Sequence, residues 1–517
     1  MRLLFKILAT VVVLTGLALA ILALAPLPTM PETGIHSNVM LRNIRILVVE
    51  SGEMTEPRDV LVSEGLIVRI MPVGQLAAAS DVLEIDGTGK YAIPGLWDMH
   101  THSTKLSAQY LHPLFLANGV TGVREMWGCM SEPDSYIACQ KERVSWNQRL
   151  AQGGASTPRY VQHSSFQING GNEVPEGYPD FFRVRNAGDA KELAAYYAGA
   201  GTDFLKIYSE LSPEAYRSLA GEARAQGLAM AGHRPLGVSL PELIAAGQRS
   251  VEHPRLFLLE CYRGASDFRA LHDPLAAFDM DLRRKLVEEH DTDACARLMA
   301  SMARAQTAWV PTLQVLAMSA RASDAGFRND PRLKYIPWSI RAGMWMPDAD
   351  NAARKSRQAG HAQTYDQLYE LAQGNLVDAH QAGVELLVGT DAGDTYIFPG
   401  FSVHDELKEF VEAGISAGDT LRLATLGAAT FSGLDHQFGS IVEGKAADIL
   451  LLNDNPLDNI EATRSIYGLL FNGRFFNRAA LDQLLRFAEQ QSNSVQFNLK
   501  LLWSLFSSPI VRVQLAD

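Results

Sequence analysis

The chain has 517 residues, of which 47% are hydrophobic and 20% are charged, and its formal net charge is −12. This composition is that of an ordinary globular protein, and the length allows two or three domains with large cores. Binding to nucleic acid needs concentrated Lys and Arg, so the acidic balance argues against a nucleic-acid partner.

The first 30 residues differ from the rest of the chain. Arg2 and Lys6 are followed by an apolar run of 19 residues, 7–25, and the small residues 23–25 suit a cleavage site. A run of this length fits a long secretory signal or an uncleaved anchor. We therefore expect a signal peptide or an N-terminal membrane anchor over residues 1–30, and the sequence leaves the choice open. In both cases we expect an exported chain that faces outside the cytoplasm, periplasmic or membrane-anchored, in a bacterial envelope.

Residues 38–93 and 437–479 share short runs rich in Val, Ile and Leu that are broken by Gly and Asp. Such runs are typical of β-strands joined by turns. Because the two segments flank a long middle region, we expect them to form one small composite β-sandwich domain. The last segment, 480–517, is apolar with few charges, and we expect a helical tail there. Whether this tail packs on the domain surface or contacts a membrane stays open.

The middle region, 94–436, alternates short apolar strands with helical segments. Ser212, which precedes a proline, and Ser239, which opens a capping box, mark two of the helix starts. Strand–helix alternation indicates parallel β/α units, and eight of them predict a TIM-like (β/α)8 barrel in an α/β fold. The surplus length falls in 255–306 and 314–375, where we expect helical insertions. The predicted strands are 96–102, 121–126, 159–164, 203–208, 229–234, 250–254, 308–313 and 386–391.

The four cysteines are an even number, which in an exported protein permits disulfide bonds. Cys129 and Cys139 lie in one loop-like stretch, so we expect them to pair. Four free thiols remain the alternative. Cys261 and Cys295 lie in the first predicted insertion, and no two of the four cysteines resemble a metal site.

Side chains that can bind a metal stand at the ends of five predicted strands. The stretch "GLWDMHTHS" places His100 and His102 on the same face of a strand. An isolated H-x-H arises readily by chance, but the carboxyl ends of all barrel strands converge on one face, where barrel enzymes have their active sites. Imidazole and carboxylate groups together suit Zn²⁺ and similar divalent ions. The candidate metal ligands are His100, His102, Lys206, His233, His253 and Asp391.

Lys206 differs chemically from the other candidates. An ammonium group has no lone pair, so Lys206 can bind a metal only after it has reacted with CO2 to form a carbamate. The carbamate carries two oxygens and a negative charge, and it can bridge two ions. An unmodified lysine in an ion pair is the alternative.

Several of these stretches resemble the amidohydrolase superfamily, namely "PGLWDMHTH", "GVREM", "DFLKIY", "AGHR", "SVEHP" and "GTDAG". The sequence is most similar to the imidazolonepropionase-like branch, which includes prolidase-like and Xaa-Arg dipeptidase-like enzymes. The likeness extends over roughly residues 40–475. It is specific for the superfamily and much less specific for a substrate.

The resemblance implies a site with two divalent ions, which we take to be zinc. His100, His102 and Asp391 would hold one ion and His233 with His253 the other, while carbamylated Lys206 and a hydroxide would bridge them. Asp391 would act as the catalytic residue, first as a general base and then as a general acid. One-ion relatives without a carbamate also exist, so one-ion chemistry stays open.

Five side chains are candidates for substrate contacts. Tyr208 shares a strand face with Lys206 and is expected to donate a hydrogen bond to the substrate carbonyl. Asn172, in "INGGN", replaces a histidine that the branch often has, while His163 lies on the third strand. Arg124, at the end of the second strand, and Arg234 are candidates for binding a substrate carboxylate.

We therefore expect a metal-dependent hydrolase of an amide bond in a small peptide or an N-acyl amino acid. A hydrolase of a cyclic amide, lactone or ester would use the same metal ligands and is the first alternative. A non-catalytic, membrane-associated barrel protein is the second. Homo-oligomerisation and membrane association through the N-terminus stay open.

Overall fold

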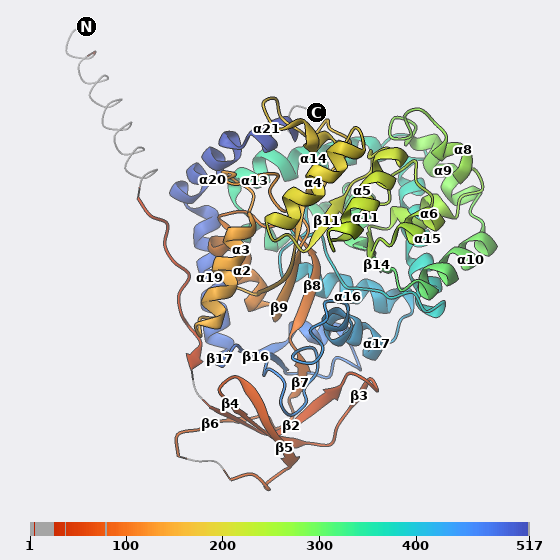
Figure 1. Ribbon diagram of the computed structural model, residues 1–517. Coiled ribbons are helices and arrows are strands. Elements are labelled where there is room, and N and C mark those ends of the chain that lie inside the picture. Colours follow the sequence, from red (N-terminus) through yellow and green to blue (C-terminus); the bar gives the residue numbers. More distant parts are fainter. Residues whose placement is uncertain (1–4, 6–24, 37, 78–79, 515–517) are drawn as a thin grey trace.

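The computed structural model describes residues 5, 25–36, 38–77 and 80–514 (Figure 1). The apolar run that predicts a signal peptide or an anchor lies almost wholly outside these residues. Within the described part of the chain, no helix is long and apolar enough to cross a membrane.

The centre of the fold is a parallel sheet of seven strands in the order β14-β13-β12-β11-β10-β9-β8, so strands adjacent in sequence are adjacent in space. Most of their residues are buried, which explains the apolar runs seen in the sequence. Their bounds are β8 (Leu96–Thr101), β9 (Val120–Glu125), β10 (Arg159–Ile168), β11 (Phe204–Ile207), β12 (Ala229–Gly232), β13 (Ser250–Glu252) and β14 (Ala308–Val310).

The eighth predicted strand is an irregular segment that nearly closes this sheet into a barrel. Leu386 forms a parallel bridge with Trp309 of β14, and Ala392 forms one with Thr101 of β8. Between the bridges, the amide of Met99 donates to the carbonyl of Val388 at 2.9 Å. The predicted α/β barrel fold is confirmed, with residues 386–392 in place of a regular eighth strand.

Helices surround the barrel (Figure 1). Two of them, α5 and α6, begin where the sequence predicts. The hydroxyls of Ser212 and Ser239 cap these helices by accepting hydrogen bonds from the amides of Ala215 and Glu242. The bounds are α2 (Ser107–Ala117), α3 (Gln140–Ala151), α4 (Ala187–Gly199), α5 (Pro213–Ala225), α6 (Leu240–Ala246), α10 (Thr292–Arg304), α15 (His361–Gln381), α16 (Phe401–Ala413), α17 (Ala417–Arg422) and α18 (Ala428–Phe431), with a 3₁₀ turn at Asp180–Arg183 and a π-helical turn at Leu423–Gly427.

The two stretches of surplus length are helical, and they lie over the ends of β13 and β14. The Cys261–Cys295 disulfide joins α10 to the segment that follows α7. The added elements are α7 (Arg255–Glu260), α8 (Ala265–Arg269), α9 (Met280–Glu288), α11 (Leu313–Arg321), α12 (Ala325–Arg328), a 3₁₀ turn at Pro331–Tyr335, α13 (Trp338–Ile340), a π-helical turn at Arg341–Trp345, and α14 (Met346–Ser356).

Both flanks of the barrel contribute to a second, mixed sheet of ten strands. β15 from the second flank pairs antiparallel with β7 from the first, and the long β2 pairs with strands in both halves of the sheet. Hydrogen bonds therefore join the two flanks into one continuous sheet with its own apolar core. The strands are β1 (Ile35–His36), β2 (Val39–Val48), β3 (Glu53–Met54), β4 (Arg58–Ser63), β5 (Leu66–Pro72), β6 (Leu83–Asp86), β7 (Tyr91–Pro94), β15 (Ile449–Leu452), β16 (Ile466–Phe471) and β17 (Arg474–Asn477), with a 3₁₀ turn at Ile460–Arg464 between β15 and β16.

The C-terminal tail is helical and runs along one side of the barrel (Figure 1). It consists of α19 (Arg478–Asn493), α20 (Val495–Ser507) and α21 (Pro509–Gln514). α19 packs against α2, with Leu481 and Leu484 fully buried.

Candidate metal centre

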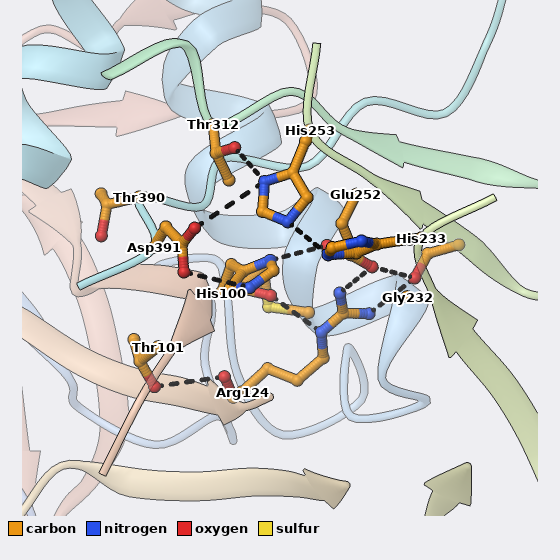
Figure 2. Close-up of polar contacts among 12 residues, drawn as sticks. His100, Thr101, Arg124, Gly232, His233, Glu252, His253, Thr312, Thr390 and Asp391 are labelled. Carbon is orange, nitrogen blue, oxygen red and sulfur yellow. Dashed lines mark hydrogen bonds and ion pairs between the residues drawn. The ribbon is translucent and has the colours of Figure 1, made fainter. Parts of the chain in front are cut away.

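Four of the predicted ligands meet at the carboxyl ends of β8 and β13 and in the closing segment. His100 Nε2 and His102 Nε2 lie 3.3 and 3.1 Å from Asp391 Oδ1, and His253 Nδ1 lies 3.8 Å from Asp391 Oδ2. One ligand atom from each of His100, His253 and Asp391 lies within 4.8 Å of the others. Figure 2 shows these side chains pointing toward one another.

His233 joins the cluster from the end of β12. Its Nε2 atom lies 3.0 Å from Nε2 of His253, and its ring stacks on Tyr208 with the ring centroids 4.0 Å apart. The structure thus places Tyr208 beside a predicted metal ligand. Burial, followed by the charge of Asp391, raises the pKa of the Tyr208 hydroxyl, so Tyr208 stays protonated and can donate a hydrogen bond.

Three of the histidine rings are held through the nitrogen that faces away from the cluster. His100 Nδ1 lies 3.0 Å from a carboxylate oxygen of Glu252, His233 Nδ1 lies 2.7 Å from Ser209 Oγ, and His253 Nδ1 lies 2.9 Å from Thr312 Oγ1. Metal-binding histidines typically have such an outer partner, which sets the tautomer and the ring orientation. When the ring proton is on Nδ1, as the Glu252 carboxylate requires for His100 and the two hydroxyls permit for His233 and His253, the Nε2 lone pairs face the centre of the cluster.

The four histidines are neutral in this environment. Burial lowers the pKa of His102 to about 3 and the pKa values of His100, His233 and His253 well below the usual range. Neutral imidazole is the form that binds metals. Burial also raises the pKa of Asp391 to about 6 and lowers that of Lys206 to about 8, which increases the fraction of neutral amine able to react with CO2.

Buried polar atoms without partners test whether these residues fit a metal ion. His100 Nε2, His102 Nε2, Lys206 Nζ and Asp391 Oδ1 have no hydrogen-bond partner among the described residues. Such atoms are rare in folded proteins, and here four of them belong to predicted ligands. The separations of 3.0 to 3.3 Å between ligand atoms resemble the roughly 3.3 Å expected around tetrahedral zinc. The residues therefore fit a divalent ion.

The backbone is strained at two of these ligands. His253 and Asp391 have φ angles of 74° and 71°, a region that residues other than glycine rarely adopt. Strain of this kind persists where the surrounding structure imposes it, and it is common at functional sites. Close packing also surrounds Gly389, where a Cβ would lie 2.9 Å from the amide nitrogen of His100.

Glu252 and Arg124 form a layer beneath the histidines. The sequence analysis did not single out Glu252, and it gave Arg124 a different role. Arg124 Nη2 lies 2.7 Å from Glu252 Oε1, and its Nε donates to the carbonyl of Met99 at 2.8 Å (Figure 2). The geometry gives no support to the prediction that Arg124 contacts substrate, because its side chain is fully buried and engaged in the barrel interior. Arg124 instead supports Glu252, which holds His100.

Arg234 also has internal partners. Its side chain is buried against Glu260, at 3.4 Å, and donates to the carbonyl of Pro235. It is therefore not available as the substrate contact that the sequence predicted.

The other two predicted substrate contacts lie apart from the cluster. His163 is buried, and the charge that acts on it comes from Arg143 of α3, which lies outside the barrel. Asn172 is exposed in the loop that follows β10. Neither residue contacts a predicted metal ligand among the described residues, and the geometry gives no support to either prediction.

The loop after β9 borders the cluster from another side. Trp127 packs against the ring of His102 with centroids 5.7 Å apart, and its amide donates to Glu125. The predicted Cys129–Cys139 disulfide is present in this loop. The bond holds together the two ends of the loop segment that follows Trp127.

A cavity of about 420 Å³ opens beside His253 and is built largely by the helical insertions. Apolar side chains, among them Leu258 of α7, Leu286 of α9 and Leu316 of α11, make up just over half of its lining residues, and the others are polar or charged. Its volume is in the usual range for small-molecule sites. Arg255, two residues after His253, also lines it and makes no hydrogen bond or ion pair with the described residues. Its recorded contact is with the ring of Phe278.

Comparison with known proteins finds a family match in the C-terminal part of the chain. Residues 341–476 match the family model described as "Amidohydrolase family". This match covers part of the chain and supports the predicted resemblance to the amidohydrolase superfamily. The dihydroorotase of Carboxydothermus hydrogenoformans is 35% identical over 103 residues, which are 19% of this chain and 23% of that protein. The chain thus aligns with less than a quarter of this curated relative.

Solved structures of amidohydrolases share the fold over nearly the whole chain. Bottromycin amidohydrolase has a TM-score of 0.67 and 22% identity, covering 92% of this chain and 93% of its own. A putative prolidase from Bifidobacterium longum has a TM-score of 0.57 and 23% identity, covering 88% and 99%. A Xaa-Pro dipeptidase with bound methionine has a TM-score of 0.58 and 17% identity, covering 85% and 100%. Because the sequence identities are below 25%, these comparisons show a shared fold and do not show a shared substrate or activity.

Proposed function

We propose that this protein is a metal-dependent hydrolase of the amidohydrolase superfamily that cleaves amide bonds in small peptides or N-acyl amino acids. The observation that carries the proposal is the group of buried, unpaired ligand atoms on His100, His102, Lys206 and Asp391. His233 and His253 would complete the ligand set, and Lys206 would contribute oxygen ligands after it has reacted with CO2 to form a carbamate. Divalent ions bound there, which we take to be two Zn²⁺, would lower the pKa of a water molecule and polarise the substrate carbonyl.

The side chains around the ions have separate tasks. Asp391, whose pKa burial raises to about 6, accepts the proton of the attacking water and then passes it to the leaving nitrogen. A carboxyl group with this pKa can serve both steps near neutral pH. Tyr208 donates a hydrogen bond to the carbonyl oxygen as negative charge develops on it.

The cavity supports a substrate that carries a carboxylate beside an apolar group. Arg255 is a guanidinium without a carboxylate partner, and it lies close enough to Asp391 and Tyr208 for their charges to act on it. An unpaired arginine in a partly apolar cavity is suited to bind a carboxylate through paired hydrogen bonds. The apolar walls of the cavity would hold the adjacent side chain or acyl chain.

The cysteine pairs support an exported location. All four cysteines are joined in two disulfides, Cys129–Cys139 and Cys261–Cys295. Disulfides persist in oxidising compartments such as the bacterial periplasm. Together with the apolar run at the N-terminus, they support our proposal that the chain acts outside the cytoplasm.

The first test is to count bound metals in the purified full-length protein and in the variant Lys206→Ala. About two divalent ions per chain, falling in the variant but not in the surface control Lys191→Ala, would support the bridged centre. One ion in all three proteins would indicate one-ion chemistry without Lys206. No ion, even after incubation with Zn²⁺ and bicarbonate, would contradict the proposal.

Hydrolysis assays with the metal-loaded protein then define the substrate class. We expect turnover of dipeptides and N-acyl amino acids, and loss of turnover after chelation. Exclusive turnover of cyclic amides, lactones or esters would shift the assignment to the alternative that uses the same ligands. A loaded protein that turns over no member of the panel would favour a non-catalytic protein.

A further inference from the structure

Helix α20 is apolar on two opposite faces. Its inner face buries Phe497 and Leu501 completely. On its outer face, Val495, Trp503 and Phe506 are 54, 77 and 59% exposed. An apolar helix face is normally covered by protein or by lipid, whereas the described residues leave the side chains of Val495, Trp503 and Phe506 more than half exposed.

The exposed side chains form a continuous stripe. Leu499, Leu502, Trp503 and Phe506 follow the spacing i, i+3, i+4 and i+7, which places them on one helix face. Both leucines are partly exposed. Single apolar residues on a surface need no explanation, but a stripe with Trp and Phe at its centre marks an interaction site.

The preceding helix shows that this stripe is specific to α20. Helix α19 also buries one apolar face, but its most exposed positions include Gln483, Arg486 and Gln490. The two helices lie in the same C-terminal tail and pack on the same side of the barrel. The polar outer face of α19 is what a helix in contact with water normally has.

The N-terminal apolar run ends beside this stripe. Gln496 of α20 donates hydrogen bonds through Nε2 to the carbonyls of Ala25 and Pro26, at 2.9 and 3.2 Å. Ala25 is the last residue of the 19-residue apolar run. The described end of this run therefore lies at α20, and a bilayer accepts both an apolar sequence of this length and an exposed apolar stripe.

The charges on this part of the chain agree with a lipid surface. Between Gln490 and Gln514 the sequence contains Lys500 and Arg512 but no Asp or Glu. Basic residues near apolar ones favour anionic headgroups, and carboxylates would oppose them. Trp is also enriched at the headgroup level of membranes, because its ring is apolar with one polar tip.

We propose that the outer face of α20 lies in the interfacial layer of a phospholipid bilayer, beside the point where the N-terminal run enters it. The catalytic domain is then held against the membrane at two places, the run and the helix. This arrangement concerns the surface of the chain and does not depend on the proposed hydrolytic activity.

The test uses single labels on the full-length chain in vesicles of phosphatidylcholine and phosphatidylglycerol. All native cysteines are paired, so a new cysteine is the one reactive thiol. We would attach bimane to Phe506→Cys, to Val495→Cys as a second position in the stripe, and to Gln483→Cys on α19 as the matched control. Each protein would be compared in vesicles with and without brominated acyl chains.

We expect brominated lipid to quench both stripe labels at least about twofold more than the α19 label, since only the stripe meets the acyl boundary. Equal quenching at all three positions, or quenching at none while the protein stays with the vesicles, would overturn the proposal. If the N-terminal run or a second copy of the chain covers the stripe instead, the stripe labels would be shielded from aqueous iodide but not quenched by lipid. That result would also overturn it.

Discussion

The Nε2 atoms of His233 and His253 lie 3.0 Å apart in a buried site, and a hydroxyl group holds the other nitrogen of each ring. Two lone pairs that face each other repel unless a proton or a metal ion lies between them. Burial lowers the pKa of both rings well below the usual range, so both rings are neutral, and each has a single ring proton that the hydroxyl at its other nitrogen can accept. A shared divalent ion is the arrangement that best satisfies both atoms.

Replacing Glu252 should weaken metal binding without touching a ligand. Glu252→Gln removes the carboxylate that orients His100 and should reduce metal affinity roughly 10- to 100-fold. It also leaves the charge of Arg124 buried without a partner, at a cost of roughly 3–5 kcal/mol in the free energy of unfolding. The double variant Glu252→Gln with Arg124→Met should recover stability but not affinity. Chelator competition and urea unfolding measure the two effects, and full recovery of both would contradict the role of Glu252.

Gly389 lies too close to His100 to accept a side chain. In Gly389→Ala, the new Cβ would lie 2.6 Å from Val310 Cγ1 and 2.9 Å from the amide nitrogen of His100, so the two segments must separate. We expect a loss of about 1–3 kcal/mol in the free energy of unfolding and weaker metal binding. The control is Gly199→Ala at the end of α4, where a Cβ has nothing within 4 Å. Equal stability of the two variants would show that the barrel tolerates the displacement.

Glu125 should make stability depend on pH. Burial raises its pKa from 4.5 to about 8, so the folded chain binds a proton that the unfolded chain releases. Stability from this group is complete below pH 4.5 and is lost as the pH rises toward 8, by at most about 5 kcal/mol. Glu125→Gln has no charge to bury and should unfold at higher urea than wild type at pH 8.5, with a smaller difference at pH 5.5.

The matched control for this effect is Glu176→Gln, at an exposed position in the loop after β10. Its urea midpoint should follow that of wild type at both pH values. If the difference between wild type and Glu125→Gln were constant with pH, the carboxyl group would not be the cause.

Arg255 should determine how well substrates with a carboxylate bind. Arg255→Gln removes the unpaired guanidinium, and we expect KM for N-acyl amino acids to rise about 10- to 100-fold, from loss of a charge-assisted contact of about 1.5–3 kcal/mol. The corresponding primary amides lack the carboxylate and should be hydrolysed with little change. The control is Lys355→Gln at an exposed position of the same cavity. A similar loss on both substrate types would assign Arg255 to structure rather than to recognition.

The sequence analysis found the candidate metal ligands because each of them stands at or just after the end of a predicted strand. His100 and His102 alternate along one strand, and His233, His253 and Asp391 follow short apolar runs, so the barrel topology alone brings them to one face. The same reasoning could not tell in which direction the side chain of Arg124 points. Its position near the end of β9 was visible, but whether its long side chain points up to the substrate or down to Glu252 depends on packing across the barrel.

By itself the sequence determined the α/β barrel, its two-part flanking sheet and the identity of the candidate ligands, and it favoured the Cys129–Cys139 pair. These features follow from local periodicity, from turn and capping residues, and from short spacings along the chain. The tertiary structure alone decided the support of His100 by Glu252, the unpaired state of Arg255 and the exposed stripe of α20. Each depends on which side chains from distant segments meet, and a partner across the fold leaves no periodic signal in the chain.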